Sequence, residues 1–542
     1  MFVHPFFEME EKCKMIQNPV LRGFCPDPSI IRAGDDYYIA VSTFEWFPGV
    51  KIFHSRDLKN WEQIGAALTR TSQIDMKGDP TSGGVWAPCL SYDGERYYLV
   101  FTDVKTKKGR FYNTHNYLIW TDDIRKEWSD PVYLNSIGFD PSLFHDTDGK
   151  KYLINMVNGF KGVLVQEIDP ETWKLVGERK KVYSGSGIGC TEGPHMYHIG
   201  EWYYLLTAEG GTGYSHCVSM ARSKSIWGPF ETDPENPFLT SDAEHSDALQ
   251  KCGHGDLVQT PSGEWYVAHL CARAQEKLSV LGRETALQKV VLTEEGWFRL
   301  EAGGRFGKWT TEEPLENKRM AEIQSGKDAG KENTRDDFEN GEEWNSWQNG
   351  YVSPRTPLGS HADLTARKGY LRLTGQESMN SLHRVTLAAK RQQELHMCAE
   401  TKMDFHPICE EQLAGLAYMY DAMNFYIAGK TVDADGHPVL VLLKSDSGVI
   451  TDEIPAVLLE TEAEIIFRAQ TSGNGAEVDF TYSADGGENW HVLKAGCTTE
   501  ILTDEHCRGF TGAHFGMYVH DMAGFSAYAD FDYFEIKDLN QA

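Results

Sequence analysis

GDDYYIAVS at residues 34–42 decides the fold, because the same pattern recurs four more times in the first half of the chain. Each copy begins with a turn that contains glycine, continues with an aromatic pair or near-pair, and ends in strand-forming residues. The other copies are GERYYLVFT at 94–102, DGKKYLINM at 148–156, GEWYYLLTA at 200–208 and SGEWYVAHL at 262–270. Every copy predicts a hairpin that leads into a β-strand.

The spacing of the copies predicts the architecture. They recur at intervals of roughly 50 to 60 residues, the length of a four-stranded propeller blade with a loop insertion. Several intervals close on a tryptophan-centred segment, as in RDLKNWEQIG, RKEWSDPVYL and KSIWGPFE. We therefore predict an all-β fold that begins with a five-bladed β-propeller. An open β-sandwich with repeated hairpins is the alternative, since aromatic turns recur there too.

A short motif precedes each hairpin in what reads as one common register. The motifs are PDPSII with Asp27, VWAPCL with Trp86, FDPSLF with Asp140, TEGPHM with Glu192 and CGHGDL with His254. The first strand of every propeller blade lines the central channel, so residues at equivalent positions converge on the axis. The sequence therefore predicts that these five residues form one cluster.

Three carboxylates and a histidine among aromatic residues are the groups that glycoside hydrolysis needs. One acid protonates the leaving oxygen, and a base activates water on the opposite face of the sugar. Asp27, Asp140 and Glu192 each stand beside or next but one to a proline, which restricts the local backbone. A single Asp-Pro pair is more often a turn or a cap, but three carboxylates in blade register favour catalysis.

The composition excludes several classes of protein. At 542 residues the chain is too long for one ordinary core, and its net charge of -28 disfavours nucleic acid as a partner. No apolar window is long enough to predict a transmembrane helix. The first residues, MFVHPFFEMEEKCKM, lack a signal-peptide pattern, and the eleven cysteines include no CxxC pair. We therefore expect a cytoplasmic location with reduced thiols.

Longer stretches of the chain resemble a known family. They include NPVLRGFCPDPSIIRAGDDYYIAVSTFEWFPGV, GGVWAPCLSY, FDPSLFHDTDGKKYL, TEGPHMY, YLLTAEGGTGYSH, KCGHGDLVQT and LGRETALQK. From about Asn18 to its end, the chain is similar to glycoside hydrolase family 43, and within it to the β-xylosidase branch. The resemblance implies hydrolysis with inversion and without a required cofactor. It also implies that Asp27 is the general base, that Glu192 is the general acid, and that Asp140 tunes the pKa and orientation of Glu192.

The resemblance implies further residues around the sugar. Arg283, in LGRETALQK, would contact the sugar and the carboxylates, and Phe44 and Trp86 would form aromatic walls. His254 would help to hold a divalent cation, often calcium, through water. The structural alternatives are a surface ion pair for Arg283, core aromatics for Phe44 and Trp86, and a hydrogen-bonded core histidine for His254. The segment NGFKGVLVQE, which borders the site, is shorter than is usual in the branch, where an aromatic-bearing loop is common.

A change in composition divides the chain. TEEPLENKRMAEIQSGKDAGKENT is highly charged and nearly devoid of large apolar residues, so we predict a propeller at 1–311, a linker at 312–335 and a second domain at 336–542. Short β-rich stretches separated by turn residues predict a β-sandwich there. The resemblance implies a concanavalin-like sandwich whose loop around Phe510 reaches the active site and imposes an exo mode.

The predicted activity is that of an inverting exo-β-xylosidase that acts on short oligosaccharides. An α-L-arabinofuranosidase, or an enzyme with both activities, is the alternative, because small differences in pocket shape separate the two pentoses. A sugar-binding propeller without catalysis would lack one carboxylate, and an interaction scaffold would lack convergent acids. We expect neither a nucleic-acid nor a membrane partner, and relatives suggest a homodimer or homotetramer.

Overall fold

The computed structural model describes residues 15–241, 248–315, 317, 334–339, 350–460, 462–524 and 526–540. Residues 1–14, which make up nearly all of the segment that lacks a signal-peptide pattern, and most of the predicted linker 312–335 lie outside these residues, so the domain boundaries stay predictions. Within the described ranges, no helix has the length and apolar character that crossing a bilayer would require.

Five antiparallel sheets form the blades of a propeller, which confirms the architecture predicted from the repeats. The first blade consists of β2 (Ser29–Ala33), β3 (Asp36–Val41), β5 (Gly49–Ser55) and β6 (Glu62–Leu68). The second consists of β7 (Gly84–Tyr92), β8 (Tyr97–Lys108), β9 (Phe111–Thr121) and β10 (Val132–Asn135). The third is β11 (Gly138–His145), β12 (Lys151–Val157), β13 (Val163–Ile168) and β14 (Leu175–Tyr183). The fourth consists of β15 (Glu192–Ile199), β16 (Trp202–Glu209), β17 (Cys217–Ser223), β18 (Glu231–Thr232) and β19 (Leu239–Thr240). The fifth consists of β20 (Gln250–Gln259), β21 (Trp265–Ala272), β22 (Glu284–Leu292) and β23 (Phe298–Leu300).

The repeated aromatic pair explains how the blades pack. Adjacent residues of a strand point to opposite faces of the sheet. Tyr37 accordingly packs in a cluster with residues of the fifth blade, whereas Tyr38 packs with residues of the second. Tyr97 and Tyr98 repeat the arrangement toward the first and third blades. The pair in each of these two repeats therefore supplies the core on both sides of its blade.

The ring closes between the first and the last blade. The chain that precedes the first blade runs along the fifth, where β1 (Met15–Gln17) pairs with β24 (Thr310–Glu312) and Asn18 Nδ2 donates to Leu287 O at 2.7 Å. Nearer the axis, Ser29 Oγ donates to Asp256 Oδ2 at 2.9 Å. These bonds join segments from opposite ends of the propeller sequence.

Two antiparallel sheets pack face to face in the second half of the chain, as predicted for a β-sandwich. One sheet contains β25 (Thr334–Asp336), β27 (Ala362–Asp363), β28 (Leu371–Thr374), β30 (Met397–Phe405), β36 (Ile465–Thr471), β37 (Glu477–Ser483), β38 (His491–Thr498) and β40 (Tyr528–Asp538). The other contains β29 (Thr386–Arg391), β31 (Gln412–Asp421), β32 (Asn424–Val432), β33 (Pro438–Asp446), β34 (Val449–Asp452), β35 (Val457–Leu458) and β39 (His514–Asp521). Short helices lie at η1 (Gly359–His361), η2 (Glu500–Leu502) and α3 (Asp504–Cys507).

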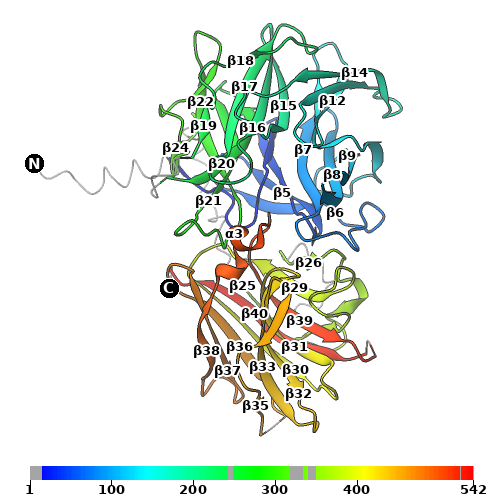
Figure 1. The fold of residues 1–542 in the computed structure, drawn as a ribbon, viewed down its shortest axis with the longest axis vertical. Coiled ribbons are helices and arrows are strands. Elements are labelled where there is room, and N and C mark those ends of the chain that lie inside the picture. The colour runs from blue at the N-terminus through cyan, green and yellow to red at the C-terminus, as the bar shows by residue number, and fades with distance from the viewer. Residues whose placement is uncertain are drawn as a thin grey trace, which may run out of the picture.

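The sandwich is joined to the propeller by backbone pairing and by buried side chains, with α3 at the junction (Figure 1). In the junction, β26 (Ser353–Pro354) pairs with β4 (Trp46–Phe47), which lies in the connection between β3 and β5 of the first blade. The Trp46 ring stacks on His514, with ring centroids 4.0 Å apart. Lys251 Nζ of the fifth blade lies 3.1 Å from an Asp504 carboxylate oxygen in α3. These contacts hold the loop that follows α3 against the propeller.

Candidate active site

A cavity of about 330 Å³ lies near the amino ends of the inner strands, where the sandwich loop meets the propeller. All eight site residues predicted from the sequence line it: Asp27, Phe44, Trp86, Asp140, Glu192, His254, Arg283 and Phe510. The structure therefore brings together residues from all five blades and from the second domain. Their individual roles stay predictions.

Asp27 is held as an anion by its neighbours. Arg283 Nη1 lies 3.1 Å from Asp27 Oδ1, and the Ser42 hydroxyl donates to Asp27 Oδ2 at 2.7 Å. Burial raises the pKa of Asp27, but other effects, chiefly the Arg283 charge with the Ser42 hydrogen bond, outweigh burial, so the pKa lies below its ordinary value. A buried carboxylate that stays ionised is suited to accept a proton from water.

Asp140 and Glu192 lie in the opposite electrostatic situation. Burial raises the pKa of Asp140 to about 8, with a further contribution from the Asp27 charge, although Asp140 Oδ2 accepts the Gly193 amide at 3.0 Å. Burial, followed by the charges of Asp140 and Asp27, also raises the pKa of Glu192 well above its ordinary value. Like charges at close range cannot all ionise, so this pair keeps a proton near neutral pH.

Two buried polar atoms of the cavity have no hydrogen-bond partner among the described residues. They are Glu192 Oε1 and Arg283 Nε. An unpaired buried polar atom is costly, and at a functional site such atoms often await a ligand. A protonated Glu192 could donate to a glycosidic oxygen, and Arg283 Nε could donate to a sugar hydroxyl.

The inner strands carry a backbone feature that the sequence did not reveal. In blades two to five a register shift interrupts the pairing of the inner strand with its neighbour. A residue with left-handed φ marks the equivalent place in every blade: Asp27 at 52°, Ala87 at 28°, Asp140 at 50°, Gly193 at 54° and His254 at 47°. Such bulges re-aim side chains, and non-glycine residues with this φ are uncommon.

The predicted common register is therefore wrong for two residues. Trp86 and Glu192 stand one position before the left-handed residue of their blades, whereas Asp27, Asp140 and His254 occupy it. The reason in the fourth blade is steric. A Cβ at Gly193 would lie 2.9 Å from His254 Nε2, so a side chain at that position would collide with the imidazole. The carboxyl group comes instead from the preceding residue.

Aromatic rings form one wall of the cavity. The ring centroids of Phe44 and Trp86 lie 6.1 Å apart, and Phe510 lies 5.8 Å from each of them. The Arg283 guanidinium lies 5.3 Å from the Phe44 and Phe510 centroids. Phe44 and Trp86 also belong to a hydrophobic cluster that extends into the sandwich, so they line the site and pack the domain junction together.

The cavity is also lined by Lys107, Tyr112 and Phe160, which were not among the predicted site residues, and by Arg508 of the loop predicted to reach the site. Lys107 and Tyr112 come from the ends of β8 and β9, and no motif marked them. Phe160 belongs to the short segment that was predicted to border the site, and the centroids of the Phe160 and Phe139 rings lie 5.8 Å apart. Lys107 Nζ lies 4.6 Å from the Phe510 centroid, and burial lowers the pKa of Lys107.

The cavity offers little protein coordination for a cation. Burial lowers the pKa of His254 to about 4, so its imidazole is neutral and could bind a metal, but Nδ1 already lies 3.6 Å from Asp27 Oδ1. Calcium prefers six to eight oxygen ligands. Among the described residues, a group of three metal-binding side chains occurs at the surface, at Asp433, Asp435 and His437, and not in this cavity. The residues at His254 alone do not make a calcium site.

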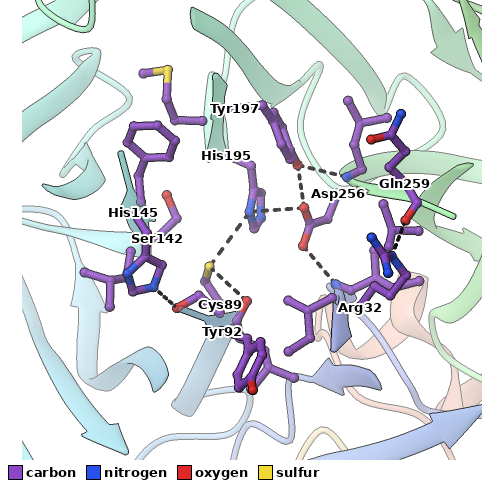
Figure 2. A pocket seen from close by; sticks show the side chains of 18 of the residues that line it. Arg32, Cys89, Tyr92, Ser142, His145, His195, Tyr197, Asp256 and Gln259 are labelled. Carbon is purple, nitrogen blue, oxygen red and sulfur yellow. Dashed lines mark hydrogen bonds and ion pairs between the residues drawn. The ribbon is translucent and has the colours of Figure 1, made fainter. Parts of the chain in front are cut away.

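A second cavity, of about 350 Å³, lies toward the carboxyl ends of the inner strands and is shown in Figure 2. His195 lies at its centre, with Nδ1 3.6 Å from Asp256 Oδ1, and its ring centroid is 6.4 Å from that of His254. The Asp256 carboxylate accepts hydrogen bonds from the Tyr197 and Ser29 hydroxyls. No buried side-chain nitrogen or oxygen of the described residues that line it lacks a partner. The unpaired acid thus distinguishes the first cavity as the candidate active site.

Two family models match the chain. The model of glycosyl hydrolases family 43 matches residues 16–298, and that of the beta xylosidase C-terminal concanavalin A-like domain matches residues 335–537. The second match gives the sandwich the type that the resemblance implied.

Full-length relatives show the same similarity. The chain is 42% identical to a xylosidase/arabinosidase 43B of Humicola insolens, over 96% of this chain and 97% of that protein. It is 41% identical to a beta-xylosidase of Bacillus subtilis (strain 168), over 96% and 99% of the two chains. The crystal structure of xylan beta-1,4-xylosidase from Bacillus halodurans C-125 superposes on this structure with a TM-score of 0.91 at 43% sequence identity. The superposition covers 96% of this chain and 100% of that chain.

Proposed function

The chain belongs to family 43 of the glycosyl hydrolases, and on that premise we propose that it is a β-xylosidase that releases xylose from the non-reducing ends of xylo-oligosaccharides with inversion. One observation carries the mechanism. Asp27, whose pKa lies below its ordinary value, lines the same cavity as Asp140 and Glu192, whose pKa values are raised. Inverting hydrolysis requires an ionised base and a protonated acid, which these pKa shifts favour.

Glu192 acts as the general acid. Its raised pKa favours the protonated carboxyl, and its Oε1 has no partner among the described residues. As the bond between the anomeric carbon and the glycosidic oxygen breaks, Glu192 gives its proton to that oxygen and becomes a carboxylate. Asp140 raises the pKa of Glu192, because a negative charge on Asp140 disfavours a second one on Glu192.

Asp27 acts as the general base. It accepts a proton from a water molecule, whose oxygen attacks the anomeric carbon from the face opposite the leaving group. Arg283 stabilises the charge of Asp27 before the reaction and leaves Nε for the sugar. The products are xylose of inverted, α configuration and the shortened oligosaccharide, and the reaction needs no cofactor.

The sandwich loop supports an exo mode of action. Phe510 and Arg508 close one side of the cavity, and Phe510 O accepts a hydrogen bond from Arg283 Nη2 at 3.0 Å. A cavity of about 330 Å³ walled in this way suits one pentose and the start of the next sugar, but not a chain that continues in both directions.

The experiment compares two chromogenic substrates and one natural one. We expect faster hydrolysis of 4-nitrophenyl β-D-xylopyranoside than of 4-nitrophenyl α-L-arabinofuranoside, and NMR of xylobiose hydrolysis should show α-xylose first. Release of β-xylose first would contradict inversion. Failure to hydrolyse any pentoside would favour the alternative that the protein is a sugar-binding propeller without catalytic activity.

An α-L-arabinofuranosidase activity is the second candidate. The name of the Humicola insolens relative pairs the two activities. A small change in pocket shape changes the relative binding free energy of the two pentoses by only about 1–3 kcal/mol. A preference for the arabinofuranoside in the same assay would assign this activity as the main one.

The remaining expectations accompany this function as proposals. A calcium ion beside His254 would take most of its ligands from water, because His254 belongs to no group of three metal-binding side chains among the described residues. Treatment with EDTA is then expected to change the melting temperature slightly, and mass spectrometry of the native protein would detect a retained ion. The described cysteines form no disulfide and are mostly buried, which suits a cytoplasmic location. A homodimer or homotetramer is testable by light scattering.

A further inference from the structure

Ser82 lies outside the cavity lining but contacts three of the groups that shape it. It precedes β7, is 1% exposed, and has a left-handed φ of 55°. A serine in this conformation costs conformational energy, which suggests that its surroundings hold it there for a reason. Its three polar groups, the amide, the carbonyl and the hydroxyl, each make a hydrogen bond.

The carbonyl oxygen of Ser82 positions two side chains of the cavity. It accepts a hydrogen bond from Trp86 Nε1 at 3.0 Å and another from Lys107 Nζ at 3.3 Å. The same lysine lies 5.6 Å from the Trp86 ring centroid. One backbone oxygen therefore sets the orientation of an aromatic wall and of the cation beside it.

The hydroxyl of Ser82 reaches the other domain. Ser82 Oγ accepts the Phe510 amide at 3.0 Å, and a Cβ at Gly509 would lie only 3.0 Å from the same oxygen. On the other side, Arg283 Nη2 donates to the Phe510 carbonyl at 3.0 Å. The second and the fifth blade thus hold the backbone of one residue from opposite sides.

Glu45 anchors Ser82 in turn. The Ser82 amide donates to Glu45 Oε2 at 2.9 Å, and the Arg355 amide of the second domain donates to the Glu45 backbone oxygen at 2.7 Å. Glu45 is itself 3% exposed, so this carboxyl lies in the domain junction. The turn that carries Ser82 is therefore fixed by the junction, not by the sugar site.

We propose that Ser82 is a positioning residue that holds Phe510, Trp86 and Lys107 in the geometry that binds the oligosaccharide. The inference rests on the proposed function, because it assigns these three groups to substrate binding. Ser82 touches neither the general acid nor the general base, so it acts on binding and not on proton transfer. Loss of its hydroxyl releases the Phe510 amide while the backbone bonds to Trp86 and Lys107 remain.

The test compares Ser82→Ala, Ser82→Gly and a control. Both variants lack the hydroxyl, but only glycine relieves the left-handed φ. The control is Ser353→Ala, which removes another buried hydroxyl of the domain junction, one that donates to Thr356 O at 2.5 Å. We expect both Ser82 variants to raise KM for xylobiose roughly threefold to tenfold, the effect of one lost hydrogen bond, with kcat within about twofold of wild type. The pH profile of kcat should not move.

Hydrogen exchange gives a readout that does not depend on activity. In both Ser82 variants the Phe510 amide should exchange faster, while the Gly509 amide, which donates to Asp504 O at 3.2 Å, keeps its protection. Unchanged Phe510 exchange together with unchanged KM would overturn the proposal. Normal KM in Ser82→Gly would show that substrate binding does not need the hydroxyl and would also overturn the proposal. An inactive wild-type protein would instead refute the proposed function, and the exchange result would still decide the contact.

Discussion

Asp27 and Arg283 form a buried ion pair at 3.1 Å between residues 256 positions apart in the sequence. The pair joins the chain just before the first inner strand to the fifth blade, so the same contact adds to closure of the propeller and favours the ionised form of the candidate base. The second guanidinium nitrogen binds the Phe510 carbonyl, which adds the sandwich loop to this arrangement.

Replacing Arg283 should shift the pH dependence of activity. The Arg283 charge lowers the pKa of Asp27, so Arg283→Met should raise that pKa. As the pH falls, the variant should then lose activity at a higher pH than the wild type does. We expect the acidic limb of kcat/KM to move up by about one unit or more, and Arg283→Lys, which keeps a charge, to move it less. An unmoved acidic limb in Arg283→Met would contradict the assignment of Asp27 as the base.

The acid and the base should respond differently to the leaving group. Glu192→Ala should lose little activity on aryl xylosides with acidic phenols, which depart without protonation, and roughly 100- to 10,000-fold on xylobiose. Asp27→Ala should lose activity on every substrate, because water still needs a base. A series of substituted phenyl xylosides measures this, and equal losses for Glu192→Ala across the series would refute its role as acid.

Asp140→Asn should stabilise the protein at alkaline pH. Because the folded-state pKa of Asp140 is raised to about 8, its contribution to stability is complete below its unfolded pKa, near 4, and is lost as pH rises through about 8. Asparagine escapes this loss and can still accept the Gly193 amide. We expect a melting temperature higher by roughly 2–4 °C at pH 8 and no gain at pH 4. The exposed Asp148→Asn serves as the control, and equal effects of the two variants at pH 8 would contradict the prediction.

Gly282→Ala should disturb the sandwich loop. A Cβ at Gly282 would lie 2.1 Å from Thr511 O, and its φ of 70° is left-handed. Gly263→Ala is a matched control, since its φ is 91° but the nearest atom lies 3.9 Å away, on the Gln259 side chain. Both should lose roughly 1–2 kcal/mol through backbone strain, and only Gly282→Ala should also raise KM by displacing Phe510. Calorimetry and xylobiose kinetics would show this, and an equal KM in the two variants would count against it.

The sequence by itself determined the blades and the three carboxylates. Glycine turns and aromatic pairs act within a few residues, so each hairpin is specified locally, and the number of copies predicts the number of blades. Asp27, Asp140 and Glu192 could be identified because they stand beside those repeats. Phe510 could be proposed only through family resemblance, because no local pattern ties it to the propeller.

The tertiary structure decided the rest. It placed Glu192 one residue before the predicted register because the His254 ring occupies the space beside Gly193. It brought Phe160 and Lys107 into the cavity and joined Ser82 to Phe510 across 428 positions of sequence. Such contacts arise where separate elements pack against one another. Local propensity acts between near neighbours and cannot specify these contacts. They form when folded elements pack closely against one another.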